Sequence, residues 1–119
     1  AYSTYLCTDE ETYLQTKASF IFRKLDNLRV KGKKEPVTIY EIMGYRSEAS
    51  VEDHELIHSF ESAFDLYQKK EFEAAMKAFS VLYGTTKDSV SRMYAERCAD
   101  LIKNPPADKW DGVYDMKSK

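Results

Sequence analysis

The chain has 119 residues, of which 43% are hydrophobic and 32% are charged, a composition typical of a folded globular protein rather than a disordered segment. Its net charge of −2 and pI near 5.7 argue against a protein that binds nucleic acid electrostatically. No apolar run approaches the roughly 20 residues that cross a bilayer, so no membrane segment is predicted. Cys7 and Cys98 form no metal or redox motif. We expect both to be reduced and buried in a cytoplasmic protein, with a disulfide between them left open.

The beginning of the chain predicts a strand followed by a short helix. Residues 2–8 (YSTYLCT) contain Tyr, Thr and Leu, which favour a strand. Thr8 stands where a helix N-cap is expected, and Glu11 stands where it would complete a capping box. We therefore predict a helix over residues 9–17.

Two apolar-rich runs, residues 20–31 and 37–43, predict a β-hairpin. The alternation of the first run is interrupted at residues 24–26, where Leu25 is out of phase, so we expect a bulge or bend there. Gly32 supplies the backbone freedom for the turn, and Pro36 can open the second strand because a first residue need not donate to the ladder.

The second strand of this hairpin is apolar on both faces. One face carries Val37, Ile39 and Met43, and the other carries Tyr40 and Ile42. A hairpin with one face in water should alternate cleanly, and an isolated hairpin is only marginally stable. We therefore expect the strands to be covered by the remainder of a larger domain, by a second copy of the chain or by the helices that follow. Dimerisation or strand exchange is expected when the chain stands alone.

Residues 45–51 are predicted to be a linker, because the apolar period changes from two to 3.6 after them. Three helical stripes follow in the sequence. They consist of Leu56, Ile57, Phe60, Ala63, Phe64 and Tyr67; of Phe72, Ala75, Met76, Phe79, Leu82 and Tyr83; and of Val90, Met93, Tyr94, Cys98, Leu101 and Ile102. The pattern predicts a bundle of three amphipathic helices.

The ends of these helices are also marked in the sequence. A short break at residues 69–71 predicts that the first two helices are antiparallel. Asp88 or Ser89 is expected to cap the third helix, and the Pro105–Pro106 pair to end it. Trp110 is expected to fold back on the bundle, with a turn at residues 111–112 and a frayed basic end.

The hairpin carries specific residues in a specific order. Val30-Lys31-Gly32-Lys33 is followed by Pro36-Val37 and by Ile39-Tyr40-Glu41. This series resembles the last two strands of the class III adenylyl/guanylyl cyclase catalytic domain. The resemblance extends upstream to Tyr2-Ser3-Thr4 and Asp9-Glu10-Glu11-Thr12, with Ser3 and Asp9 departing from the usual Gly and Ser. It covers residues 1–44. An unrelated hairpin with a basic turn would explain the alternation but not this order of residues.

The resemblance implies that a parent enzyme converts ATP, or less readily GTP, to a 3′,5′-cyclic nucleotide and pyrophosphate. Such chemistry requires metal ions that bridge the phosphates, and two Mg or Mn ions are expected in the parent. The family's metal-binding aspartates, its transition-state Asn and Arg and its base-selecting residues would all precede residue 1. No catalytic residue, metal ligand or cofactor is therefore expected in this fragment, which should be inactive alone.

One family role falls on a residue of this chain. The first Lys of the Val-Lys-Gly-Lys hairpin binds the triphosphate in cyclases, which implies Lys31 as a substrate-binding residue and makes Lys33 the less favoured choice. An ammonium at the tip of a strand is suited to phosphate oxygens. The plainer interpretation is that Lys31, Lys33 and Lys34 form a solvated turn, and it is favoured for the fragment alone because a lone Lys holds a nucleotide poorly.

The helical half resembles a tetratricopeptide unit, with Tyr67, Phe72, Ala75 and Phe79 at suitable spacings and Ala63 and Lys70 in place of the usual glycines. One unit is too few for a solenoid groove. A plain three-helix packing module is favoured over a peptide-binding role.

His54 and His58 stand four residues apart on a predicted helix, a spacing that can bind a metal. Two histidines without a third ligand are weak support, and a solvated helix face is the favoured interpretation. We therefore predict no metal site.

Together these observations predict an α+β chain: a small antiparallel sheet fragment with a short helix, then a three-helix, tetratricopeptide-like bundle. The predicted regions are residues 1–44, the end of a cyclase domain; residues 45–51, a linker; and residues 52–119, a helical module. The expected partners are the rest of the cyclase domain and a second copy, because cyclase domains work as dimers. The alternative is a stand-alone interaction or dimerisation module, which an exposed apolar groove between the first two helices would favour.

Overall fold

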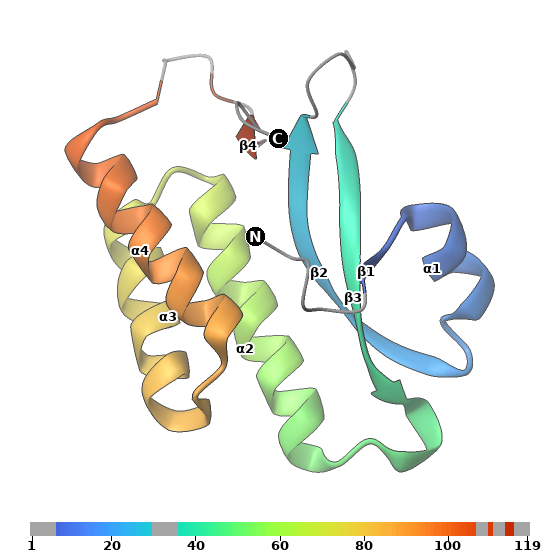
Figure 1. The fold of residues 1–119 in the computed structure, drawn as a ribbon. Coiled ribbons are helices and arrows are strands. Elements are labelled where there is room, and N and C mark those ends of the chain that lie inside the picture. The colour runs from blue at the N-terminus through green and yellow to red at the C-terminus, as the bar shows by residue number, and fades with distance from the viewer. Residues whose placement is uncertain (1–6, 30–35, 107–109, 111–113, 116–119) are drawn as a thin grey trace. The chain divides into compact units, whose positions relative to one another are not determined.

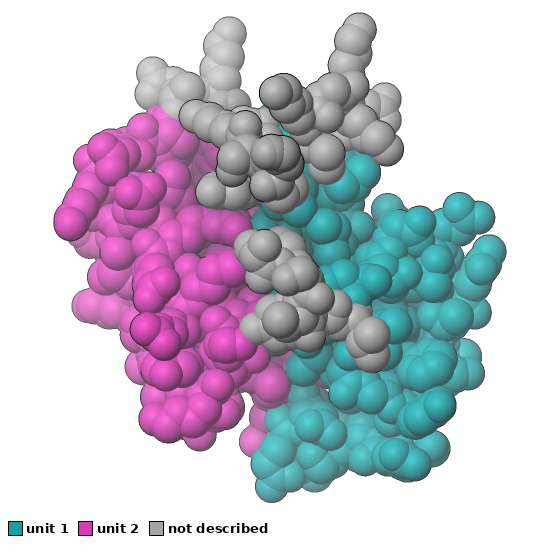
Figure 2. Space-filling view, viewed as in Figure 1, with its two compact units in different colours: residues 1–54, 113–119 teal, residues 55–112 magenta. Residues whose placement is uncertain are grey.

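A computed structural model describes residues 7–29, 36–106, 110 and 114–115 (Figure 1). The chain divides into two compact units (Figure 2). The first comprises residues 1–54 and 113–119, and the second comprises residues 55–112. The predicted α+β class is confirmed, because strands dominate the first unit and helices form the second.

The first unit is built on a sheet whose strands have the order β1-β3-β2-β4. The strands are β1 (Cys7–Thr8), β2 (Phe20–Arg29), β3 (Val37–Tyr45) and β4 (Tyr114–Asp115). β3 pairs antiparallel with both β1 and β2, and β4 pairs parallel with β2. The predicted hairpin is thus confirmed for the described residues, and its turn at Gly32 lies outside them.

The β2–β3 ladder contains two irregularities. The one between Lys24 and Asp26 confirms the predicted bulge, with Leu25 as the extra residue on β2. A second irregularity lies between Ile21 and Phe22, where the pairing steps from Ile21↔Gly44 to Phe22↔Ile42 and Met43 is the extra residue on β3. A bulge on each strand bends the hairpin and increases its local twist.

The short helix α1 (Glu10–Thr16) forms as predicted, but its cap is a different residue. The Asp9 side chain accepts a hydrogen bond from the Thr12 backbone N–H at 2.9 Å, so Asp9, and not Thr8, is the N-cap. A carboxylate is a strong acceptor for the unsatisfied N–H groups at the positive end of a helix. The same hydrogen bond holds the pKa of Asp9 below its usual value.

One face of the hairpin is covered by α1, which lies beside β3 in Figure 1. The Tyr13 ring stacks on the Tyr40 ring with centroids 4.1 Å apart, and it meets the edge of Phe22 at 5.0 Å. These three rings form an aromatic cluster that anchors the helix to the sheet. One of the two apolar faces of the hairpin is therefore covered from within the first unit.

The predicted linker is ordered at both ends. Arg46 opens a 3₁₀ turn, η1 (Arg46–Glu48), and its guanidinium donates to the Lys17 carbonyl oxygen at 2.8 and 3.1 Å and to the Phe20 carbonyl oxygen at 3.3 Å. Ser50 and Asp53 exchange reciprocal hydrogen bonds of 3.0 and 3.1 Å, a capping box that starts the next helix. Hydrogen bonds therefore hold both ends of the predicted linker.

Three helices follow: α2 (Val51–Gln68), α3 (Phe72–Thr86) and α4 (Ser89–Lys103). They confirm the break at residues 69–71 and the three predicted stripes, except that Ile102 of the third stripe is exposed. Asp88 caps α4, because its side chain accepts a hydrogen bond from the Ser91 N–H at 3.1 Å. Asp88 was one of the two residues predicted for this cap. The last helix ends before Pro105, as predicted.

The core of the second unit is aromatic. The Tyr94 ring lies 5.0 Å from Phe79, 5.2 Å from Tyr67 and 5.6 Å from Phe60, so residues from all three helices meet around it. Trp110 packs against Tyr67 at 5.4 Å, which confirms the predicted return of the chain to the bundle. The described helices include none long and apolar enough to cross a membrane.

The end of the chain departs from the predicted helical module. Tyr114 and Asp115 form β4 and pair with Leu28 and Arg29 of β2, so this segment belongs to the sheet. The sequence offered only two β-forming positions between polar residues, which is too short a pattern to predict a strand. The predicted turn at residues 111–112 and the frayed end lie outside the described residues.

The turn between α2 and α3 generates a test of the helical unit. Lys70 has a φ of 67°, its N–H donates to the Tyr67 carbonyl at 3.1 Å, and the Glu71 N–H donates to the Leu66 carbonyl at 3.0 Å. This is a Schellman motif, in which glycine is preferred at the left-handed position. We expect Lys70→Gly to raise the free energy of unfolding by about 0.5–1 kcal/mol, measured by urea denaturation.

Lys77→Gly is the matched control, because the same exchange within α3 should lower stability by about 1 kcal/mol. If both variants lose stability equally, the left-handed assignment at Lys70 is wrong.

Candidate functional site

The residues predicted to bind the triphosphate, Lys31 and Lys33, lie between β2 and β3 and outside the described residues. The described hairpin ends at Arg29 on one strand and resumes at Pro36 before the other. The assignment of both lysines therefore stays a prediction. The structure instead shows how the two strands that lead to them are held.

A row of three polar side chains crosses the sheet near the middle of the hairpin. Cys7 on β1 faces Glu41 on β3, and Glu41 faces Arg23 on β2. The Arg23 Nε and Nη2 atoms lie 2.9 and 2.8 Å from the same Glu41 oxygen, Oε1. The Arg23 side chain is 1% exposed and that of Glu41 is 12% exposed. The pair is therefore a buried ion pair that includes a charge-assisted hydrogen bond from Arg23 Nε to Glu41 Oε1.

The charges of this ion pair affect the pKa of the Cys7 thiol. Partial desolvation raises the pKa of Cys7 above its usual value, the Glu41 carboxylate raises it further, and Arg23 opposes the shift. Cys7 is exposed and not disulfide-bonded, so its predicted burial was wrong while its reduced state holds. It lies on a two-residue strand at one side of β3, which leaves it open to solvent.

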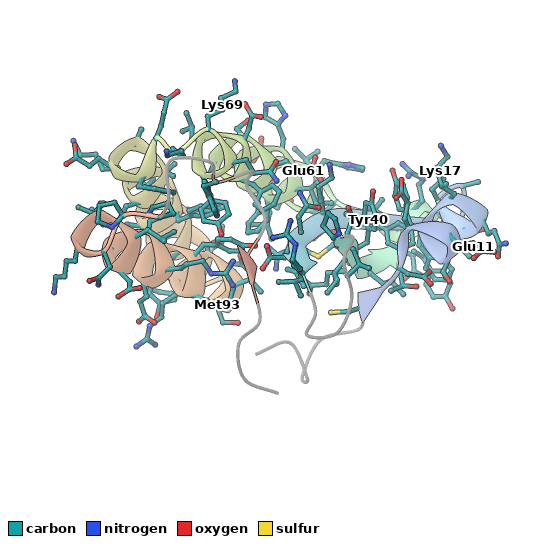
Figure 3. All side chains as sticks on the ribbon, turned by 90° about the horizontal axis from the view of Figure 1, so that it is seen from above. Glu11, Lys17, Tyr40, Glu61, Lys69 and Met93 are labelled. Carbon is teal, nitrogen blue, oxygen red and sulfur yellow. The ribbon has the colours of Figure 1, made fainter. Side chains whose placement is uncertain are left out.

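A second row lies one residue further along and points to the opposite face, since side chains alternate along a strand. It consists of Thr8, Tyr40 and Lys24. Tyr40 is the residue on which Tyr13 of α1 stacks, and Figure 3 shows it on the hairpin next to the helix that carries Glu11. The two faces of the hairpin thus differ: one is aromatic and helix-covered, and the other carries the ion pair.

Closer to the tip, the strands are held by a further cross-strand contact. The Thr38 hydroxyl donates to the Asn27 side-chain oxygen at 2.8 Å, directly beyond the Leu25 bulge. The buried Asp26 carboxylate accepts from the Asn27 N–H at 2.8 Å. These bonds restrain the strands on the side from which the tip emerges.

Metal binding finds no support in the residues that the structure describes, where no three His, Cys, Asp or Glu residues group as ligands. His54 and His58 are both exposed on α2, as the plainer interpretation of their spacing predicted.

The helical unit has a shallow groove between α2 and α3. It encloses about 460 Å³ and is lined by Ser59, Lys77, Ala78, Val81, Leu82 and Thr85. Val81 is 66% exposed, unusually high for an aliphatic residue of an amphipathic helix. The groove is the feature that the interaction-module alternative requires. Figure 3 shows Glu61 on α2 and Met93 on α4 in this unit.

The ion pair escaped sequence reasoning for a definable reason. Counting pairs from the turn without bulges places Lys24, and not Arg23, opposite Glu41. The available signal was a carboxylate, Glu41, and two cations, Arg23 and Lys24, at nearly equal distances from the hairpin turn. The Leu25 bulge determines that Arg23 is the one that pairs with Glu41.

Comparison with known proteins gives one informative match. The chain is 31% identical over 86 residues to "Adenylate cyclase, terminal-differentiation specific" from Dictyostelium discoideum. The match covers 71% of the chain and 4% of that protein, so the chain spans only a small part of this relative. No protein-family model and no solved structure match the chain. The chain is therefore related to a segment of an adenylate cyclase.

The extent of this match is informative beyond its identity. A stretch that covers 71% of the chain must include the middle of the chain, whichever end it starts from. The middle contains all of β3 and α2 and most of α3. The relationship therefore extends past the hairpin, on which the resemblance rested, into the helical unit.

The buried Cys98 generates a test with a defined pH dependence. Burial raises the pKa of its thiol to about 11, with nearby Arg97 opposing the shift. The unfolded thiol ionises near pH 8.5, so the unfolded state loses its proton first as the pH rises. We expect the stability that Cys98 contributes to be full below about pH 8.5 and lost progressively up to about pH 11.

The measurement compares unfolding of the wild type, Cys98→Ala and the control Cys7→Ala from pH 8 to 11. The alkaline decline should become shallower in Cys98→Ala by clearly more than in Cys7→Ala, because the pKa of Cys7 is also raised but by less. Equal slopes in all three proteins would contradict the burial of this thiol.

Proposed function

We propose that the chain is the C-terminal end of a class III nucleotide cyclase catalytic domain together with the helical module that follows it. The parent enzyme would convert ATP, or less readily GTP, to the 3′,5′-cyclic nucleotide and pyrophosphate for intracellular signalling. The observation that supports this most is the match to an adenylate cyclase, because it spans the hairpin strand β3, the helix α2 and most of α3.

Within the proposed enzyme, the chain's own contribution is a supported loop that presents a cation to the triphosphate. Two Mg or Mn ions, held by residues outside this chain, would bridge the phosphates. Lys31 would neutralise charge on the phosphate oxygens, and Lys33 is the less favoured candidate. The remainder of the domain and a second copy of the enzyme are the proposed partners of the sheet, and the cytoplasm is the proposed location.

Lys31→Ala in the intact parent enzyme tests this role. We expect the KM for the triphosphate to rise by roughly tenfold, because a cation that contacts phosphate contributes about 1–2 kcal/mol to binding. Steady-state formation of cyclic nucleotide from ATP, with GTP as a second substrate, provides the measurement.

Lys34→Ala is the matched control and should leave the KM unchanged. Kinetics of Lys31→Ala that equal those of the wild type would reject the assignment. Cyclic nucleotide production by the 119-residue chain alone would overturn the proposal that its parent supplies the catalytic residues.

A second candidate function, a dimerisation module formed by the helices, is favoured by the groove between α2 and α3. The groove combines the exposed Val81 with the small Ala78 and the hydroxyls of Ser59 and Thr85. Small side chains at a groove allow another helix to approach closely, and a second copy would hold the proposed enzyme as a dimer.

Sedimentation of the chain tests this second candidate. We expect a dimer that Val81→Glu converts to a monomer, because a carboxylate placed in a closed apolar contact would be desolvated. Val51→Glu is the control, since Val51 is equally exposed but lies outside the groove. A monomeric wild type, or a dimer that survives Val81→Glu, would exclude the groove as a self-association surface.

A further inference from the structure

The two bulges of the β2–β3 hairpin compensate each other. The pairs Ile21↔Gly44 and Asp26↔Ile39 belong to one common register, although they lie on opposite sides of the bulges. The three pairs between them, Phe22↔Ile42, Arg23↔Glu41 and Lys24↔Tyr40, are offset from that register by one residue. The middle of the hairpin is thus displaced while both ends stay aligned.

The sequence makes a regular alternative available. If the pairing of Asp26 with Ile39 continued without a bulge, Leu25 would face Tyr40 and Lys24 would face Glu41. That alternative also sets a cation opposite the carboxylate, and it would remove both irregularities. The observed structure therefore reflects a choice between two neighbouring cations, Arg23 and Lys24, for a single carboxylate.

Apolar packing makes part of this choice, because the offset pairing places Phe22 on the face of Tyr40, where its ring lies 5.0 Å from that of Tyr13. A one-residue shift turns each side chain to the other face, which normally fixes a register wherever one face is apolar. Here β3 is apolar on both faces, with Ile39 and Met43 on one and Tyr40 and Ile42 on the other. The apolar residues of β3 therefore do not fix the register by themselves. A directional polar contact adds a second preference for the offset pairing.

We infer that Arg23 and Glu41 are positioning residues whose ion pair holds the middle of the hairpin one residue out of register. An arginine is suited to this task because Nε and Nη2 form a fixed fork, and both atoms reach Glu41 Oε1 within 2.9 Å. A lysine presents a single ammonium on a flexible stem and cannot reproduce that geometry. The contact of Tyr13 with Phe22 supports the same arrangement, with a less directional interaction.

The consequence lies in the direction of the hairpin. A bulge bends its strand, increases the local twist and re-aims the residues beyond it. Two bulges in succession set the course of β2 and β3 before they lead to the tip. On the proposed function, which this step rests on, the ion pair therefore positions the ends of β2 and β3, between which Lys31 stands in the sequence.

Exchange of the two cations is the sharpest variant. Arg23→Lys combined with Lys24→Arg keeps the composition and charge of the chain, but moves the fork to the position that faces Glu41 in the regular pairing. We expect the ratio of offset to regular pairing to fall by at least about tenfold, as loss of a buried charge-assisted bond predicts. Arg23→Gln should shift the ratio in the same direction.

Nuclear magnetic resonance of the labelled chain reports the pairing directly. Cross-strand proton contacts between Arg23 and Glu41 mark the offset pairing, and contacts between residues 24 and 41 and between residues 25 and 40 mark the regular one. Lys24→Gln is the matched control, because it removes the rival cation and should leave the offset intact. Persistence of the offset in both Arg23 variants overturns the inference.

The reactivity of Cys7 gives a second readout that does not depend on the proposed function. Arg23→Gln should raise the pKa of this thiol and Glu41→Gln should lower it, because the two charges act on Cys7 with opposite signs. Rates of alkylation against pH measure both shifts. An unchanged Cys7 pKa in both variants would show that Arg23 and Glu41 do not lie next to this thiol, contrary to the structure.

The intact parent enzyme then tests the functional consequence. We expect the exchange variant to raise the KM for the triphosphate several-fold while kcat changes less, and Lys24→Gln to leave both unchanged. If the offset is lost and the KM stays constant although Lys31→Ala raises it, the ion pair does not aim the tip. If Lys31→Ala also leaves the KM constant, the proposed function fails and the pairing result stands by itself.

Discussion

The ion pair between Arg23 and Glu41 is the interaction on which the sheet unit depends. It joins the two longest strands at their middle, it is almost fully buried, and it lies between the two places where the ladder changes register. Burying two charges is costly, so such a pair adds little stability over an apolar pair of equal size. Its contribution is specificity, because removing either partner leaves the other charge buried and favours another pairing. The same two strands carry further contacts on either side of the ion pair. These are the stack of Tyr13 on Tyr40 and the Thr38–Asn27 hydrogen bond.

The helical unit is held together by a different principle. Its helices meet through stacked and edge-on aromatic rings around Tyr94, and Arg97 lies 4.6 Å over the face of that ring. Aromatic rings bury large apolar areas and retain preferred geometries, so a short bundle gains a defined core from few residues. The ion pair thus gives the sheet unit its register, whereas aromatic packing holds the helical unit together. The match to a Dictyostelium adenylate cyclase includes parts of both units, which indicates that they occur together in that relative.

Much of the fold could be predicted from the sequence because the patterns concerned are local. The hairpin, the bulge near Leu25, the three helices, the Asp88 cap and the return of Trp110 all follow from periodicity and turn chemistry. The features that sequence reasoning missed depend on exact register or on distant pairing. Which cation faces Glu41 is decided by a bulge, β4 forms only against a strand far away in the chain, and the exposure of Cys7 follows from its place beside β3. The Asp9 cap was missed because Thr8 and Asp9 are both good capping residues.

A double-mutant cycle tests the central claim most directly. It compares the free energies of unfolding of the wild type, Arg23→Met, Glu41→Gln and the double variant. A charge-assisted hydrogen bond and a second ion-pair contact in a buried setting predict a coupling energy of about 1.5–3 kcal/mol between the two positions. A coupling below about 0.5 kcal/mol would show that the two side chains act independently, and would contradict an account in which their ion pair organises the sheet.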